Sequence, residues 1–176
     1  MKAPYRVTLA AFASLVLAAV GGGAAVSQEK ASTLKQHLVR TWTLIDVYFE
    51  WPGGRRTQPY GPDVKGRLVL DQSGLFSFQA IGADRPKFSS SNRREGTAEE
   101  NATVVRMTES FFGTYSVDEA DQTIILHLER AMFPNWDGSD RKYKVVFKGD
   151  EMLTTGPPTP STTGSYIPNQ LWKRTN

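Results

Sequence analysis

The chain has 176 residues, no cysteine, two histidines far apart in sequence, and a formal net charge of +3. The absence of cysteine excludes a disulfide framework, and two distant histidines give no basis for a dedicated zinc or iron site. Without Lys2 and Arg6 of the N-terminal segment, 19 Lys and Arg face 18 Asp and Glu, so the charge does not indicate a nucleic-acid-binding face.

The N-terminal segment has the layout of a secretory signal peptide. Lys2 and Arg6 precede an apolar stretch over 7–20, which is shorter than the ~20 residues that span a bilayer. Small residues follow, and Ala25-Val26-Ser27 fits a cleavage site. We therefore expect 1–27 to be removed and the protein to be periplasmic or secreted, with an uncleaved anchor as the alternative. Residues 28–37 would form a polar segment with a short helix, and 38–176 one domain.

Short segments rich in β-branched and aromatic residues follow, separated by turn residues. Short connections between strands predict antiparallel pairing, and eight such strands close into a barrel wide enough for one small ligand. A two-sheet sandwich is the alternative. The predicted strands are 42–51, 67–71, 75–80, 114–117, 123–130, 141–147, 151–154 and 171–174.

The long connection after the third strand contains one predicted helix. Thr97 stands three residues before Glu100, which is the spacing of a capping box. Val104, Met107 and Phe111 then fall on one apolar stripe of a helix. We expect this stripe to pack against one end of the sheet.

Several dispersed motifs carry a family resemblance. They are PYGPDVKGRLVLDQSG, the RPKF of 85–88, the FGTYSVDE of 112–119, the ILHLE of 125–129, the FPNWDGSD of 133–140 and the terminal LWKR. In this order they resemble the bacterial and fungal lipocalin-like domain family, from about Leu38 to Arg174. Arg40 stands where that family tends to have Gly, and Leu126 where it often has the first of two His. The resemblance implies an all-β, eight-stranded antiparallel barrel that binds small, often hydrophobic molecules, and it implies no catalytic residues.

His127 and Glu129 are the sharpest candidate pair. Residues two apart in a strand share a face, so both would lie opposite the aliphatic Leu126 and Leu128. Facing solvent, they would form a surface ion pair worth ~0–1 kcal/mol. Facing the barrel interior, they would contact a ligand or form a proton-transfer dyad.

Other side chains are candidates for a ligand site at the barrel mouth. Trp136 and Phe133 occupy a connection that ought to be polar, so they either plug the barrel or line its mouth. Arg85 suits a ligand carboxylate or phenolate, or caps a strand end. The predicted ligand contacts are His127, Glu129, Arg85, Tyr115, Gln79, Tyr60, Asn135 and Trp136.

These observations predict an exported monomer that holds an apolar or aromatic molecule in a barrel cavity. The alternative is an isomerase or cyclase that uses His127 and Glu129 for proton transfer in the same cavity. A third possibility is a stress or envelope protein with a filled barrel that works through its surface. We expect no metal, no cofactor, no nucleic-acid partner and no stable membrane span after signal cleavage.

Overall fold

The computed structural model describes residues 33–175, so the predicted signal peptide and residues 28–32 lie outside the described residues. Within the described range, no helix is both long enough and apolar enough to cross a bilayer.

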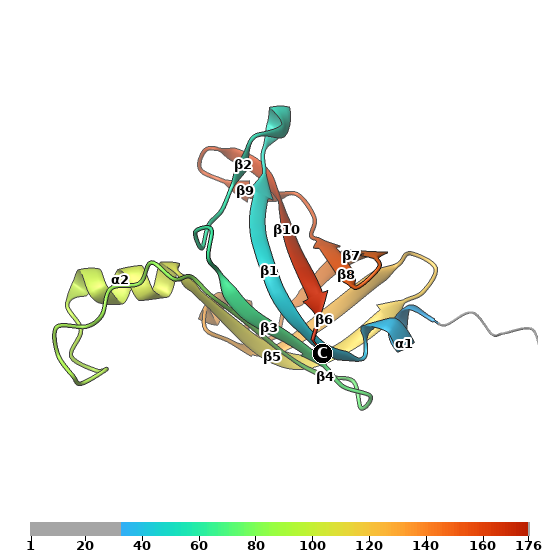
Figure 1. Cartoon of the computed structure of the whole chain (residues 1–176), viewed down its shortest axis with the longest axis horizontal. Helices are drawn as coiled ribbons and strands as arrows, with labels where there is room; N and C mark the ends of the chain where they lie inside the picture. Colours follow the sequence, from blue (N-terminus) through green and yellow to red (C-terminus); the bar gives the residue numbers. More distant parts are fainter. Residues whose placement is uncertain (1–32, 176) are drawn as a thin grey trace, which may run out of the picture. The chain divides into compact units, whose positions relative to one another are not determined.

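Eight antiparallel strands form a closed barrel, as the sequence predicted (Figure 1). Each strand pairs with the next along the chain, and β1 also pairs with β10, which closes the sheet. The short strand β2 (Arg56–Thr57) pairs with β1, and the short strand β9 (Thr159–Ser161) pairs with β10. The barrel strands are β1 (Arg40–Glu50), β3 (Lys65–Leu70), β4 (Leu75–Ile81), β5 (Thr108–Asp118), β6 (Thr123–Ala131), β7 (Asp140–Lys148), β8 (Glu151–Thr155) and β10 (Gly164–Arg174).

Aromatic side chains fill the interior of the barrel. Phe78 and Phe111 stack with ring centroids 4.4 Å apart, and Trp172 meets Phe78 edge-on at 5.7 Å. All three side chains are almost completely buried. Aromatic rings bury large areas and favour stacked or edge-on contact, so this cluster is a major source of core stability.

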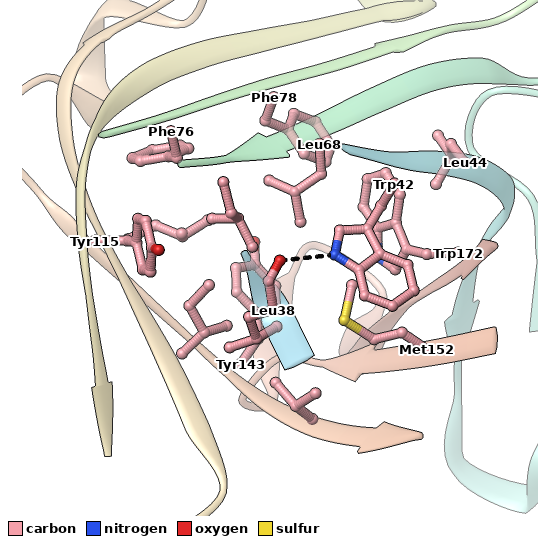
Figure 2. Packing of buried hydrophobic residues seen from close by; sticks show 14 of the residues in the cluster. Leu38, Trp42, Leu44, Leu68, Phe76, Phe78, Tyr115, Tyr143, Met152 and Trp172 are labelled. Atoms are coloured by element: carbon pink, nitrogen blue, oxygen red, sulfur yellow. Dashed lines mark hydrogen bonds between the residues drawn. The ribbon is translucent and has the colours of Figure 1, made fainter. Parts of the chain in front are cut away.

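The helix α1 (Leu34–Leu38) closes one end of the barrel (Figure 2). Leu34 and Leu38 are buried in the core, and the Trp42 indole N–H donates to the Leu38 carbonyl oxygen at 3.0 Å. The Glu119 carboxylate accepts from the first backbone N–H groups of α1, at 2.7 and 3.0 Å. These bonds satisfy groups that a helix start leaves without partners.

Two β-bulges decide which side chains face inward. In β1 the pairing with β10 shifts by one residue between Leu44 and Asp46. Leu44 is therefore buried before the shift and Val47 after it, three positions apart instead of two or four. No single alternating face of β1 is therefore buried along its whole length. One extra residue in a strand reverses the direction of every later side chain.

The second bulge lies between β5 and β6. Leu128 pairs with Gly113 and Arg130 pairs with Phe112, which leaves Glu129 without a partner position. A Cβ atom at Gly113 would come within 2.0 Å of the His127 carbonyl oxygen, so glycine permits this close approach.

The predicted helix is present, but it ends before Phe111 and is not buried against the sheet. Helix α2 (Ala98–Arg106) begins at the predicted capping box of Thr97 and Glu100. No residue of α2 is buried, and in Figure 1 the helix projects away from the barrel wall. Phe111 belongs to β5 and lies in the core, so the expected apolar stripe combined helix and strand residues. Between the last two predicted strands, the chain also forms β9 and an early start of β10, neither of which was predicted. The remaining short helices are η1 (Pro52–Gly54) and η2 (Pro134–Trp136).

We predict that Leu38→Ala destabilises the barrel by about 2–5 kcal/mol, because it leaves a cavity beneath α1. The matched control is Lys35→Ala in the same helix, whose side chain is exposed and should change stability by about 0.5 kcal/mol or less. Chemical denaturation of both variants measures the difference. Equal stabilities would show that α1 unfolds separately from the barrel.

Candidate functional site

The two ends of the barrel differ in what covers them. The connections β3–β4, β5–β6 and β7–β8 lie at the end closed by α1. The connections that carry Tyr60, α2 and η2 lie at the other end, because antiparallel strands alternate in direction. This open end holds a pocket of about 290 Å³.

The pocket has an apolar rim and a polar inner side. The apolar lining comes from α2 and from the connection between β6 and β7, with Val105, Met132, Phe133, Pro134 and Trp136. The polar lining comes from the start of β5 and from Tyr60, with Thr108, Glu109 and Ser110, while Arg106 adds a charge. This combination is typical of a small-molecule site.

Glu109 is the central acid of the open end. It lies on the inward face of β5, in phase with the buried Phe111, and the Tyr60 hydroxyl donates to its Oε2 at 2.5 Å. Neighbouring side chains enclose the carboxyl group, although the residue keeps partial solvent access at the pocket. Burial raises the pKa of Glu109, while the Tyr60 hydrogen bond and the Arg141 charge oppose this rise. The neutral acid is therefore favoured more than for a carboxyl in water.

The tyrosines around Glu109 stay protonated. Burial, together with the nearby Glu109 carboxylate, raises the pKa of Tyr60 far above its ordinary range. Burial raises the pKa of Tyr143 to about 12, and Glu109 adds to this rise while Arg141 and Gln170 oppose it. Both hydroxyl groups thus remain hydrogen-bond donors at any physiological pH.

Arg141 links the pocket rim to the barrel interior. Its guanidinium carbon lies 3.5 Å from the centre of the Trp136 ring, a cation–π contact. The same charge lowers the pKa of Glu109 and of Tyr143 relative to burial alone. Arg141 therefore both holds Trp136 in place and offsets part of the cost of burying Glu109.

A chain of hydrogen bonds continues from this cluster toward the closed end. The Thr154 hydroxyl donates to Gln170 Oε1 at 2.9 Å and accepts from the Trp172 indole N–H at 3.0 Å. All three residues are buried. Because buried polar groups are costly without partners, these bonds explain how polar side chains are tolerated inside the barrel.

One polar group beside the pocket has no such partner. The Thr108 side-chain oxygen is buried and makes no hydrogen bond within residues 33–175. Thr108 also lines the pocket, so this buried oxygen without a partner lies beside the pocket.

The structure places His127 and Glu129 outside the barrel, which corrects the expectation that they face a cavity. Leu126 and Leu128 point into the core, so the alternating side chain of His127 lies on the outer wall with 41% of its surface exposed. Glu129 is exposed at the bulge in β6. Neither side chain can contact a molecule inside the barrel. His127 pairs with Asp140 and Ser116 rather than with Glu129.

The other predicted contacts divide into two groups. Tyr60 and Trp136 line the pocket, and Trp136 also packs against the core. Gln79 is exposed on the outer face of β4, Asn135 is exposed in η2, and the Arg85 Nε donates to the Gly82 carbonyl oxygen at 2.8 Å in the loop that follows β4. Tyr115 is inside, but its hydroxyl donates to the Asp71 carbonyl oxygen at the closed end, at 2.6 Å.

The inward polar residues of the open end were missed from the sequence. Glu109 was assigned to the helix, because Phe111 continued its apolar stripe. Alternation from Glu109 through Phe111 to Tyr115 would have placed the carboxyl group inside. Arg141 and Tyr143 alternate in the same way in β7.

No cluster of three or more His, Cys, Asp or Glu residues able to hold a metal ion occurs in the described part of the chain.

Comparison with known proteins supports the fold. Residues 40–175 match the family model described as a lipocalin-like domain. The chain is also similar to an uncharacterized protein from Bacteroides eggerthii DSM 20697, at 15% identity and a TM-score of 0.39, covering 78% of this chain and 99% of that one. No curated protein shows significant similarity. Since the family model spans most of the sequence, the chain belongs to the lipocalin-like domain family.

Proposed function

We propose that this protein binds a small, largely apolar or aromatic molecule in the pocket at the open end of its barrel. The observation that carries the proposal is the pocket of about 290 Å³, with an apolar rim and the hydrogen-bonded Tyr60–Glu109 pair on its inner side. This volume lies just below the ~300–1,000 Å³ that is common for small-molecule sites. A ligand of one or two rings fits it best.

The lining specifies the orientation of the ligand. Its apolar part contacts Phe133 and Trp136 at the rim. Its polar end meets Tyr60 and Glu109, beside which the hydroxyl of Thr108 is buried. A hydroxyl or carbonyl suits this end, because the hydrogen-bonded Tyr60 and Glu109 side chains present polar atoms there.

Export forms the second part of the proposal. The charged, apolar and small-residue regions of 1–27 support secretion to the periplasm or the medium, followed by cleavage. The mature protein would act there as a monomer.

A second candidate function is proton transfer on the bound molecule, as in an isomerase. Glu109 takes the place of the predicted His127 and Glu129 pair, because it is the acid that borders the pocket and its pKa is raised. Raised carboxyl pKa values in clefts mark candidate acid–base groups. Glu109→Gln should keep ligand affinity within about threefold while abolishing turnover if this candidate holds.

We predict that a neutral aromatic probe, N-phenyl-1-naphthylamine, gains fluorescence on binding and that Phe133→Ala weakens this binding about tenfold, a loss of about 1.4 kcal/mol. Phe112→Ala is the matched control, since both rings are 49% exposed but Phe112 lies on the outer wall. Fluorescence titration gives both dissociation constants. Equal binding by the two variants would contradict the proposed site.

We also predict a pH dependence of stability from Glu109. Because the raised pKa makes the folded protein hold its proton at higher pH than the unfolded chain, the free energy of unfolding should fall as pH rises above the ordinary carboxyl value. Glu109→Gln removes this slope, since glutamine mimics the neutral acid. Thermal unfolding between pH 4 and 8 measures it, with the exposed Glu129→Gln as control. Parallel pH curves for wild type and Glu109→Gln would refute a raised pKa.

A further inference from the structure

Three polar side chains meet on the outer wall of the barrel, on the side of the sheet opposite to Glu109. Ser116 lies on β5, His127 on β6 and Asp140 on β7, and these strands are neighbours in the sheet. His127 is directly opposite Asp140, and Ser116 stands two residues beyond Thr114, the β5 partner of His127. The pairing of three strands therefore brings them together, although 24 positions separate Ser116 from Asp140 in sequence.

The distances connect the three groups in a defined order. The Ser116 Oγ lies 2.9 Å from His127 Nε2, and His127 Nδ1 lies 2.7 Å from Asp140 Oδ1. A carboxylate only accepts hydrogen bonds, so in the neutral imidazole the proton resides on Nδ1. Nε2 then presents its lone pair to the serine hydroxyl.

We propose that Ser116 is a nucleophile toward activated acyl esters, with His127 as its general base and Asp140 as the residue that positions the imidazole. A serine hydrogen-bonded to a histidine, which a carboxylate orients in turn, is the arrangement that activates serine in unrelated hydrolases. The site is separate from the pocket, because none of the three residues lines the pocket.

The reaction is an acyl transfer in two steps. The Ser116 oxygen forms a bond to the ester carbonyl carbon while its proton passes to His127 Nε2, and the bond to the leaving alcohol oxygen breaks as that oxygen takes the proton. The product is a serine ester. Water then attacks the serine ester with the same base, which releases the carboxylic acid and restores the hydroxyl.

The surroundings of Ser116 limit the substrate class. The His127 and Asp140 side chains are 41% and 52% exposed, so the reacting groups lie on an open wall rather than in a pocket that stabilises an oxyanion. Ile125 is directly opposite Ser116, and Leu75, which is 51% exposed, is opposite Thr114. These apolar neighbours suit a small acyl or aryl group. We expect slow reaction with esters that have a good leaving group, and none with peptide bonds.

The test uses p-nitrophenyl acetate and the purified protein. We expect release of nitrophenolate with an acetyl group on Ser116, located by mass spectrometry of peptides. Ser116→Ala should remove the adduct, and His127→Gln and Asp140→Asn should each slow acetylation of Ser116 at least tenfold. Ser165→Ala is the control, since this exposed serine lies on β10, away from the three groups, and should leave the rate unchanged.

Two outcomes would overturn the proposal. Acetylation of Ser116 at the wild-type rate in His127→Gln and Asp140→Asn would show that the hydrogen bonds do not activate it. Nitrophenolate release that persists in Ser116→Ala, with acetyl transiently on His127, would make the imidazole the nucleophile. All four positions are on the protein surface, and thermal unfolding of each variant verifies that the barrel is intact.

Discussion

Closure of the sheet by β1 and β10 is the constraint on which the rest of the structure depends. A closed eight-stranded barrel has no free edges and a narrow interior, so every inward side chain competes for the same volume. Trp42 and Trp172 occupy the part near α1, and Phe78 and Phe111 lie beside Trp172. The space left for a ligand is therefore at the open end, where the side chains of the loops decide what can enter.

Burying Glu109 at this end is costly, and its neighbours show how the fold offsets that cost. Tyr60 donates a hydrogen bond to the carboxyl group, and Arg141 supplies a charge of opposite sign. Even so, burial outweighs both and the pKa is raised. A barrel of this size could hold an apolar residue here at lower cost, so the retained acid is the clearest departure from pure core packing and supports a functional role.

The positions of the strands could be predicted from the sequence. For some strands, the sequence did not show which side chains face the barrel interior. Alternation and turn residues predicted all eight barrel strands, because period-two patterns and Gly- or Asp-containing turns are local properties. The bulges of β1 and β6 are not local, since an extra residue is visible only against the partner strand. Glu109 was missed for a related reason: the positions of Val104, Met107 and Phe111 fit a helical period, although Phe111 belongs to the next strand. Tyr60 and Trp136 line the pocket at the open end, and their contact with a ligand stays a prediction.

Strands β5, β6 and β7 carry both candidate sites, one on each side of the same wall. Glu109 and Arg141 point inward, while Ser116, His127 and Asp140 lie outside. Side chains on opposite faces share only the backbone, which the hydrogen bonds of the sheet hold rigid, so a substitution on one face need not disturb the other. The outer groups are exposed and the inner ones enclosed, and this difference sets the chemistry available to each. An exposed hydroxyl needs a reactive substrate, whereas an enclosed acid can act on a molecule that the barrel itself selects.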